Sequence, residues 1–404
     1  MRDASETDFD LVQFGATGFA GGLTADYLAE HAPPELRWAI AGRGRARLEA
    51  VARRVGELAP DRPEPQVIEI QLDDDDAVAA LVGRARLVLT TVGPYAIHGE
   101  PLVAACARAG TDYVDITGEP QFVDDMYLRY HEDAERTGAR LVHCAGFDSV
   151  PHDLGAMLCA QQFSGDEPLK ITGAVRANAE FSGGTFQSAI GGFGALRASA
   201  KLASQRRTVE AGRSSSNRRV HVRAGAPYKD PATGKWLAPL PTIDPQIVVR
   251  SAAALPFYGP DFTYDHRMAA KRLSTVVGLG AGVGVLLVAT AIPPLRTQLA
   301  KIKSSGTGPD AERRARSWFN VRMTGESASH RAVVEVRGGD PGYDETAKMV
   351  AETSLSLLLD DNPDVSGQVT TAVACGGALL GRLRAAGIAF EVLEGARTPA
   401  STHT

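Results

Sequence analysis

Three glycines near the start of the chain have the spacing and the setting of a phosphate-binding turn. An apolar strand is expected over residues 9–14, and Gly15, Gly18 and Gly21 follow it, directly before an amphipathic stretch. Gly15 permits a sharp turn, Gly18 lets the backbone approach a pyrophosphate, and Gly21 lets the new helix pack against the strand. At a first strand-to-helix junction this motif predicts dinucleotide binding. We expect the whole turn to hold the cofactor, namely Gly15, Ala16, Thr17, Gly18, Phe19 and Gly21.

The end of the second expected strand, 36–41, indicates which dinucleotide is bound. A site for NAD usually has Asp or Glu there, which bonds the ribose hydroxyls and repels a 2′-phosphate. Here the strand leads into Arg43, and no acidic residue occurs before Glu49. An arginine at this position pairs with a 2′-phosphate. The alternative is a solvated basic turn at a helix start. We predict NADP(H) as the cofactor, with Arg43 as the principal 2′-phosphate ligand.

Strands and helices alternate regularly over the first 165 residues. Strands are expected at 9–14, 36–41, 66–70, 86–91, 113–116 and 140–144, and helices at, for example, 45–58, 99–109 and 122–137. This alternation predicts an α/β fold with a Rossmann-type, doubly wound parallel sheet. The ligand crevice of such a sheet lies beyond the carboxyl ends of its strands. The loops that follow the strands are therefore the candidate site.

Two of these loops carry candidates for the reacting end of the cofactor. After the fourth strand, small residues leave room for ribose and nicotinamide, namely Thr91, Val92, Gly93 and Pro94. Tyr95 follows them and is a candidate proton donor, with packing or a hydrogen bond to the cofactor as its alternative role. After the sixth strand, we expect Gly146, Phe147 and Asp148 against the nicotinamide, where two domains meet. Asp148 is a second candidate catalytic residue.

The pattern changes after about Leu169 and predicts a second α/β domain with a mixed sheet. Its expected strands are at 170–179, 317–324 and 330–337. The last segments, helices at 343–359 and 370–386 and a strand at 389–394, could fold onto either domain. Residues 205–245 are polar and are expected to form a surface excursion. We assign residues 1–165 to the NADP(H)-binding domain and 166–368 to a substrate or dimerisation domain. Residues 369–395 form a C-terminal helix and strand that could return to the first domain.

The composition is that of a soluble globular enzyme of 404 residues with a net charge of −5. Its length is sufficient for two cores. It has no long basic run, so nucleic acid is not expected as a partner. The cysteines at 106, 144, 159 and 375 fit neither a disulfide framework nor zinc spacing, so we expect no metal. The acidic, polar start carries no secretory signal, which favours the cytoplasm.

Residues 273–295 contain no charged side chain and are flanked by basic residues on both sides. The length would allow a membrane span. Glycines at every second position from Gly278 to Gly284 weaken a helix and suit close packing. Three alternatives remain: a span, an element that contacts a membrane surface or an acyl chain, and a buried interface segment. The second would make the protein peripherally membrane-associated, and the third is compatible with a homodimer.

Five motifs together resemble the saccharopine dehydrogenase-like oxidoreductases. They are Gly15–Gly21, Ala41–Arg43, Val92–Tyr95, Tyr113–Glu119 and Gly146–Pro151. Within that group the chain is most similar to the trans-acting enoyl reductases of actinobacterial lipid synthesis. The resemblance is ordered over about the first 155 residues and thinner beyond them.

The resemblance implies a two-domain NADP(H) reductase that acts on a carbon–carbon double bond in a polyketide or fatty-acyl intermediate, carried by a synthase without its own enoyl reductase. Such a reaction needs a hydride at the β-carbon, a cradle for the enolate oxygen and a proton at the α-carbon. The candidate cradle is formed by the backbone amides of residues 183–185 and the hydroxyl of Thr185. The apolar stretch 273–295 could contact the acyl chain.

Two other functions remain open. An amino-acid dehydrogenase of the saccharopine type would act on an imine or secondary amine and needs an arginine-rich pocket for its substrate carboxylates. The candidate pocket segments contain only Arg176 and Arg197, which favours an apolar substrate. A lipid-associated scaffold that binds NADP(H) without turnover is the other alternative, because a nucleotide-binding fold does not prove catalysis.

Overall fold

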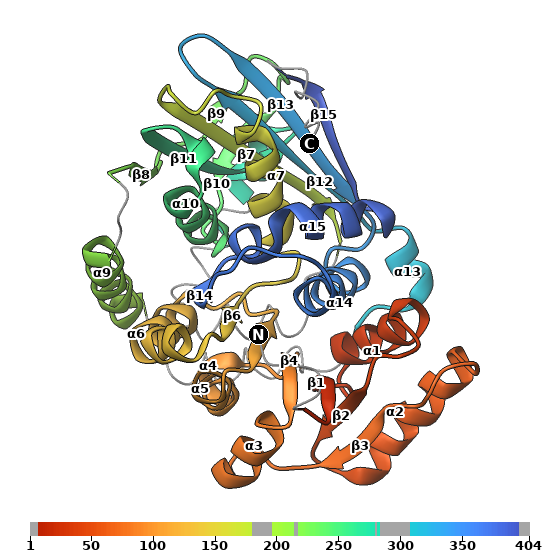
Figure 1. The fold of residues 1–404 in the computed structure, drawn as a ribbon. Coiled ribbons are helices and arrows are strands. Elements are labelled where there is room, and N and C mark those ends of the chain that lie inside the picture. Colours follow the sequence, from red (N-terminus) through yellow and green to blue (C-terminus); the bar gives the residue numbers. More distant parts are fainter. Residues whose placement is uncertain (1–6, 180–195, 214–216, 279–280, 283–307, 396–404) are drawn as a thin grey trace, which may run out of the picture.

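Two β-sheets form the framework of the protein. The computed structural model describes residues 7–179, 196–213, 217–278, 281–282 and 308–395. Figure 1 shows the first sheet in the lower half of the molecule and the second in the upper half, with helices between them. The interface between the two halves is therefore helical.

The first sheet is seven-stranded and parallel throughout, in the order β14-β6-β5-β4-β1-β2-β3. Its strands are β1 (Phe9–Phe14), β2 (Trp38–Gly42), β3 (Gln66–Glu69), β4 (Ala85–Thr90), β5 (Asp112–Asp115), β6 (Arg140–Val142) and β14 (Gly367–Val369). Every residue of the central strand β1 is buried, as expected where helices cover both faces of a parallel sheet. The predicted α/β fold with a doubly wound parallel sheet is confirmed.

Helices cover both faces of this sheet. One face carries α1 (Phe19–His31), α2 (Arg45–Leu58) and α14 (Asp344–Leu359). The other face carries α3 (Asp75–Val82), α5 (Glu100–Ala109) and α6 (Pro120–Thr137), with the single turn α4 (Tyr95–His98) before α5. The short loops between strands and helices therefore emerge together at one edge of the sheet.

The second sheet is mixed and eight-stranded. Its order is β15-β13-β12-β7-β11-β10-β9, and β8 pairs with β11. The strands are β7 (Leu169–Asn178), β8 (Arg219–Val222), β9 (Tyr228–Lys229), β10 (Trp236–Pro239), β11 (Asp261–Ala270), β12 (Trp318–Glu326), β13 (Arg331–Gly338) and β15 (Ala389–Glu394). The mixed sheet predicted for the second domain is thus present, with the expected strands β7, β12 and β13.

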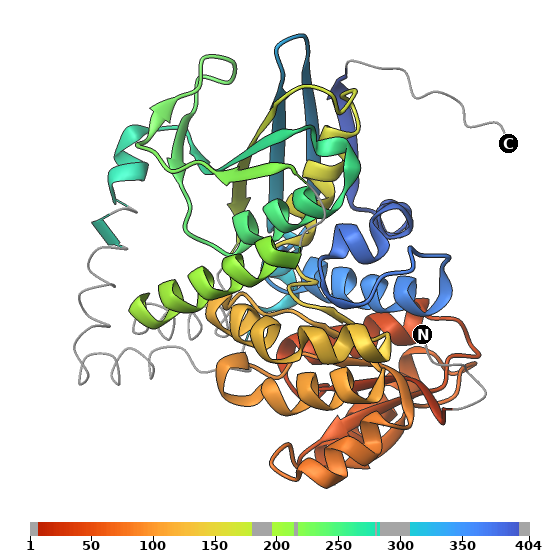
Figure 2. The same cartoon turned by 60° about the vertical axis from the view of Figure 1, so that its left-hand side comes forward.

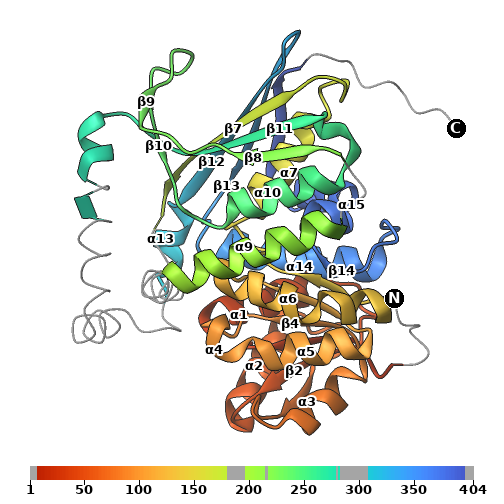
Figure 3. The ribbon, with the colours of Figure 1, turned by 90° about the vertical axis from the view of Figure 1, so that its left-hand side faces the viewer.

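Helices α7 (Val150–Ala160), α10 (Asp244–Ala254) and α15 (Thr371–Ala385) pack on the face of the second sheet that is turned toward the first (Figure 3). Helix α9 (Leu196–Arg213) lies along α6 of the first half, as Figures 2 and 3 show. The remaining short helices are η2 (Pro256–Tyr258) and α13 (Ala311–Ala315). Helix α7 packs against both α10 and α15, and all three contact strands of the second sheet.

The segment 205–245 is largely exposed, as expected for a surface excursion, but it is built from regular elements. The segment contains the end of α9, the strands β8, β9 and β10, and the start of α10. β10 and β9 extend the sheet beyond β11, and β8 pairs with β11 as a parallel strand. The segment is polar because short strands at the margin of a sheet keep many side chains in water.

Two segments lie on different sheets from those that the sequence suggested. Helix α14 and strand β14, which fall within 166–368, belong to the first sheet, where β14 pairs with β6. Strand β15, from the segment 369–395, pairs with β13 of the second sheet. The reason is that α14 presents buried residues such as Met349 and Val350, which complete the apolar layer above β4 and β5.

The uncharged stretch 273–295 is described only at residues 273–278 and 281–282, which are helical. Val276 is buried there, whereas Leu273 and Val277 are exposed. In the described parts of the chain, no helix combines the length and apolar character that crossing a membrane requires. The three alternatives for this stretch otherwise concern residues outside the described ranges.

Candidate functional site

The turn between β1 and α1 has the geometry of a phosphate cradle. Gly15 has a φ of +89°, in the left-handed region that favours glycine. A Cβ atom at Gly21 would lie 2.1 Å from the carbonyl oxygen of Gly15, so a side chain there would push α1 away from the turn. Helix α1 begins after Gly18 with no capping side chain and no acidic residue in its first turn. Its first N–H groups are therefore available to an anion.

The side chains of the other turn residues differ in their exposure to solvent. Ala16 is buried, and Thr17 is exposed beside Gly18. The ring of Phe19 packs edge-on against Tyr343, with centroids 4.7 Å apart, and lies under the guanidinium of Arg314 at 5.4 Å. Because its ring is engaged in this way, Phe19 can offer a phosphate only its backbone N–H.

The end of β2 presents one arginine that is available to a ligand. Arg43 is exposed and has no ion pair within the described ranges. Arg45, by contrast, lies 3.7 Å from Glu69 and 3.9 Å from Glu49. No carboxylate follows the strand before Glu49. The uncapped helix start and the unpaired arginine therefore fit a dinucleotide that carries a 2′-phosphate.

The loop after β4 borders the same turn. The backbone N–H of Thr91 donates to the carbonyl oxygen of Phe14 at 3.1 Å, and a Cβ atom on Gly15 would meet the Thr91 hydroxyl at 2.6 Å. Val92 is half-buried and Gly93 is exposed, before a cis peptide bond to Pro94. The four residues predicted to line the path of the cofactor thus lie at the carboxyl edge of β4, next to the phosphate cradle.

Tyr95 is held in the sheet layer. Its side chain is 5% exposed, and its hydroxyl donates to the carbonyl oxygen of Thr90 at 3.1 Å and accepts from the N–H of Ile116 at 3.4 Å. Burial, together with the nearby carboxylate of Asp115, raises the pKa of Tyr95 well above its ordinary value. This geometry favours the packing role over the predicted role of Tyr95 as a proton donor.

The loop after β6 continues the same edge. A Cβ atom on Gly146 would meet Thr346 of α14 at 2.9 Å and Ile116 at 3.4 Å, and the N–H of Phe147 donates to the Thr346 hydroxyl at 3.1 Å. The ring of Phe147 packs edge-on against Phe319 of the second sheet, with centroids 4.9 Å apart. The structure therefore brings Gly146 and Phe147 to the junction of the two halves, as predicted from the sequence.

Comparison with known proteins identifies the family. The sequence model of the saccharopine dehydrogenase NADP binding domain matches residues 11–142. A Mycobacterium tuberculosis protein named "Putative trans-acting enoyl reductase" is 37% identical over 96% of this chain and 98% of its own. A Mycobacterium ulcerans protein named "Trans-acting enoyl reductase" is 31% identical over 95% and 98%. The chain belongs to the saccharopine dehydrogenase-like oxidoreductases. It is an NADP(H)-dependent enzyme, and the cradle and Arg43 are the parts of the structure that fit this cofactor.

A solved structure agrees with the fold of this oxidoreductase. The apo, histidine-tagged saccharopine dehydrogenase (L-Glu forming) from Saccharomyces cerevisiae aligns with a TM-score of 0.55 over 95% of this chain and 100% of its own. At 13% identity the likeness concerns the fold alone. It covers both sheets, so the two-domain architecture is shared.

Asp148 of the oxidoreductase lies beside a polar cluster that the sequence analysis did not identify. Burial and the carboxylate of Asp244 raise the pKa of Asp148 to about 7, against the opposing effect of His152. His152, Asp244 and His266 are buried, and one ligand-type atom from each lies within 4.8 Å of the others. They come from α7, α10 and β11, far apart in sequence. The only sequence signal was the histidine directly after Pro151 in the first turn of a helix.

The predicted enolate cradle at residues 183–185, including Thr185, lies outside the described residues. Among the predicted catalytic residues of this family member, Asp148 is thus placed at the junction of the domains, and Tyr95 within the core of the first.

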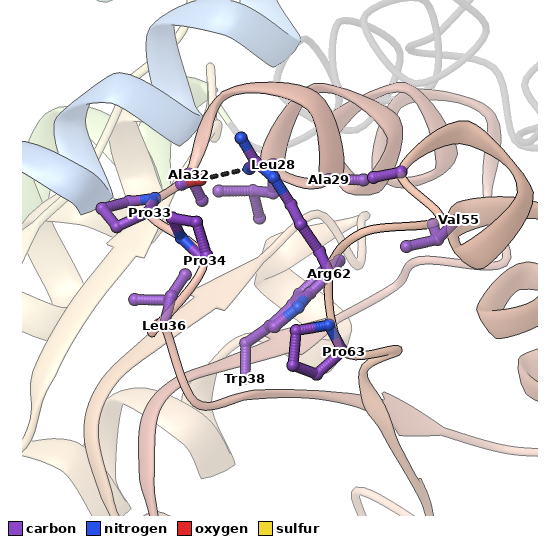
Figure 4. A pocket seen from close by; sticks show the side chains of 11 residues that line it. Leu28, Ala29, Ala32, Pro33, Pro34, Leu36, Trp38, Val55, Arg62 and Pro63 are labelled. Carbon is purple, nitrogen blue, oxygen red and sulfur yellow. Dashed lines mark hydrogen bonds between the residues drawn. The ribbon is translucent and has the colours of Figure 1, made fainter.

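A small pocket at the opposite edge of the first sheet is not part of the site (Figure 4). Its lining comes from the end of α1, the start of β2 and the end of α2. The guanidinium of Arg62 extends across it and donates to the carbonyl oxygen of Ala32. The pocket lies at the amino end of β2, whereas the cofactor of a saccharopine dehydrogenase-like enzyme needs the carboxyl end.

Proposed function

We propose that the protein is an NADPH-dependent enoyl reductase that acts in trans, on an acyl or polyketide chain made by a separate synthase in lipid synthesis. The observation that carries the proposal is the similarity to the mycobacterial proteins of that name, which spans both domains at 31–37% identity. Similarity confined to the nucleotide-binding domain would support only the cofactor. Here it includes the second sheet and α10, which supply the substrate side of the junction.

The charges of the interior favour an apolar substrate. Three arginines are buried in the described part of the chain, namely Arg140, Arg206 and Arg267. Each already pairs with a buried aspartate, respectively Asp112, Asp124 and Asp265. A saccharopine-type substrate needs unpaired arginines for its several carboxylates. The paired arginines therefore support an acyl chain over an amino-acid substrate.

The order of the loops along the carboxyl edge of the first sheet supports a role for each of them in binding the cofactor. The glycine turn binds the pyrophosphate, and Arg43 pairs with the 2′-phosphate. The residues Thr91–Pro94 line the path toward the junction, where Phe147 borders the reacting end. NADPH, when bound, supplies the hydride for the β-carbon of the unsaturated chain. The second domain then has to hold the acyl chain and exclude water.

The experiment is NADPH consumption with a long-chain α,β-unsaturated acyl thioester, with NADH in parallel. We expect turnover with NADPH and a product whose mass is higher by two hydrogens. The saturated thioester is the matched control and should not react. If NADPH binds but no thioester is reduced, whether presented on coenzyme A or on an acyl carrier protein, the enoyl reductase proposal is wrong. Turnover of an imine under those conditions would support the amino-acid dehydrogenase alternative.

A further inference from the structure

His152 is a buried histidine, and neither of its ring nitrogens forms a hydrogen bond of ordinary geometry within the described ranges. It lies in the first turn of α7 and is 2% exposed. Its Nδ1 atom is 2.6 Å from Oδ1 of Asp244, which is itself 3% exposed. Within the described ranges nothing forms a hydrogen bond with its Nε2 atom. A buried polar atom normally has a hydrogen-bond partner. Nε2 of His152 is therefore a candidate to contact a ligand or a reacting group.

The groups behind Asp244 fix the direction of the hydrogen bonds. The hydroxyl of Thr242 donates to Oδ2 of Asp244 at 2.5 Å and lies 3.0 Å from Nε2 of His266. Because the hydroxyl proton is committed to Asp244, Nε2 of His266 must carry the proton that it donates to Thr242. Nδ1 of His266 is then the acceptor that faces the hydroxyl of Tyr264, 3.4 Å away.

The charges agree with this assignment. Burial lowers the pKa of His266 to about 4, so this histidine is neutral and serves as a fixed donor. Burial alone would raise the pKa of Asp244, but its two histidine neighbours and the bond from Thr242 lower it. Asp244 is therefore an anion with one oxygen held by Thr242 and the other against Nδ1 of His152. A carboxylate in that position orients an imidazole and stabilises its protonated form.

The same three residues do not have the spacing of metal ligands. Ligands in a tetrahedral zinc site with bonds of about 2.0–2.1 Å lie about 3.3 Å from one another. The 2.6 Å between Nδ1 of His152 and Oδ1 of Asp244 is shorter than that and is the distance of a close ion pair. This spacing favours an ion pair over a shared metal ion.

Its location is the expected one for the reacting end of the cofactor. His152 follows the loop 146–149 after the carboxyl end of β6, and its ring is 6.3 Å from that of Phe147. β6 is three strands from β1, or about 14 Å along the edge at a strand spacing of about 4.8 Å. That is the direction in which the dinucleotide extends from the cradle, toward the second domain.

A second histidine–carboxylate pair lies elsewhere. Nδ1 of His143 is 2.6 Å from Asp115. Its ring packs against Tyr113 and Phe122 inside the first domain, at centroid distances of 5.4 and 5.5 Å. Asp115 also accepts hydrogen bonds from Tyr113 and from the backbone of Thr117 and Cys144. Nε2 of His143 also lacks a hydrogen-bond partner within the described ranges. Because the ring packs among side chains of the first domain, we assign this pair to the link between β5 and the end of β6.

We propose that His152, oriented by Asp244, is the acid that protonates the α-carbon of the substrate. Asp244, Thr242 and His266 are positioning residues. The inference rests on the proposed enoyl reduction. The π bond of the alkene breaks, the β-carbon gains the hydride with its two electrons, and the α-carbon forms a new C–H bond. The N–H bond at Nε2 of His152 breaks and leaves its electron pair on the ring, which solvent reprotonates after product release.

The test compares His152→Gln and Asp244→Asn with His330→Gln, which alters an exposed histidine in the turn between β12 and β13. We expect His152→Gln to lower kcat by about 100-fold to 10,000-fold, the usual contribution of a general acid. NADPH affinity and the circular dichroism spectrum should stay at wild-type values. Asp244→Asn should lower kcat as well, whereas His330→Gln should match the wild type.

Two further measurements distinguish an acid role of His152 from a purely structural role, because a structural role would leave both results unchanged. Added imidazole should partly restore turnover in His152→Ala, which keeps the proposal testable if the glutamine variant folds poorly. ¹⁵N NMR of the histidine rings should show His266 protonated at Nε2, assigned by its loss in His266→Gln. Protonation of His266 at Nδ1 instead would remove the chain that holds Asp244 and would contradict the arrangement.

The outcomes separate this proposal from the function on which it rests. If the wild type reduces the thioester and His152→Gln retains kcat within threefold, His152 is not the acid, while the enoyl reductase proposal stands. If the wild type reduces no thioester, both proposals fail together. Stoichiometric zinc in the purified protein, lost in His152→Gln, would show that the cluster binds metal and would overturn the acid role.

Discussion

At the scale of single residues, the structure distinguishes groups that are already paired from groups that remain available. Arg45 is bound to two glutamates, whereas Arg43 is left for a ligand. Tyr95 has both hydroxyl partners inside the sheet layer, whereas His152 has an open nitrogen at the domain junction. Availability, more than residue type, therefore decides which side chains are candidates for function.

Replacing Arg43 with alanine should weaken NADPH binding by about 10-fold to 100-fold, because a charge-assisted hydrogen bond contributes about 1.5–3 kcal/mol. NADH affinity should not change, since NADH lacks the 2′-phosphate. Fluorescence titration with both nucleotides checks this. Arg45→Ala is the matched control and should bind NADPH within about threefold of the wild type. Equal losses in the two variants would mean that the basic turn acts only through its overall charge.

Replacing Asp148 with asparagine should stabilise the protein at alkaline pH. The folded pKa of about 7 lies above the unfolded value of about 4, so the carboxyl group binds its proton more tightly in the folded state. The stability that it confers is complete below about pH 4 and is lost as the pH rises through 7. Asp148→Asn has no such loss.

Melting temperatures measured from pH 5 to pH 8 provide the check. The advantage of Asp148→Asn over the wild type should grow up to about pH 7 and then level off. A difference that does not vary with pH would show that the carboxyl group is not perturbed.

At the scale of elements, the first sheet was predictable because its strands are apolar and regularly spaced. Strand β11 was missed because Asp265, His266 and Arg267 stand in its centre. These residues look like a loop in sequence, but they are buried and partnered in the fold. The His152–Asp244–His266 cluster was missed for a related reason: its members meet only after α7, α10 and β11 have packed. Arg43 and the glycine turn could be predicted because each lies directly after a strand in one short stretch of sequence.

The start of α1 depends on one glycine contact. Gly21→Ala would place a methyl group 2.1 Å from the carbonyl oxygen of Gly15, so α1 must move away from β1. We expect a lower melting temperature and loss of NADPH binding, measured by thermal unfolding and titration. Gly22→Ala is the control, because its methyl group would lie 3.3 Å from the flexible end of Arg54 and at an ordinary contact distance of 3.6 Å from the carbonyl oxygen of Ala16. If Gly21→Ala binds NADPH normally, the cradle does not require this close approach.

At the scale of the whole molecule, the first domain is not a continuous stretch of sequence. Helix α14 covers β4 and β5, and β14 extends the sheet beside β6, although both elements come after seven of the eight strands of the second sheet. The sequence showed the alternation of elements but not which sheet each late segment would join. The sheet that a late segment joins depends on the apolar surface of the first sheet that α1 and α2 leave uncovered. This surface exists only in the folded structure.

A fragment of residues 1–165 should therefore fail to fold, since the apolar side chains beneath α14 would be exposed to water. Joining this fragment through a flexible linker to residues 343–370 should restore folding. Circular dichroism, thermal unfolding and NADPH titration of the two proteins provide the measurement. A fragment 1–165 that melts cooperatively and binds NADPH would show that α14 is dispensable.

The passage of the chain between the two sheets has a mechanical consequence. In strand order it crosses from one sheet to the other three times, from β6 to β7, from β13 to β14 and from β14 to β15. Two domains joined by one connecting segment can rotate about many axes. Three connecting segments permit rotation only about a hinge axis that passes close to all of them. Any opening of this enzyme should therefore follow one direction, and each closure should return the second domain to the same position over the carboxyl edge of the first sheet.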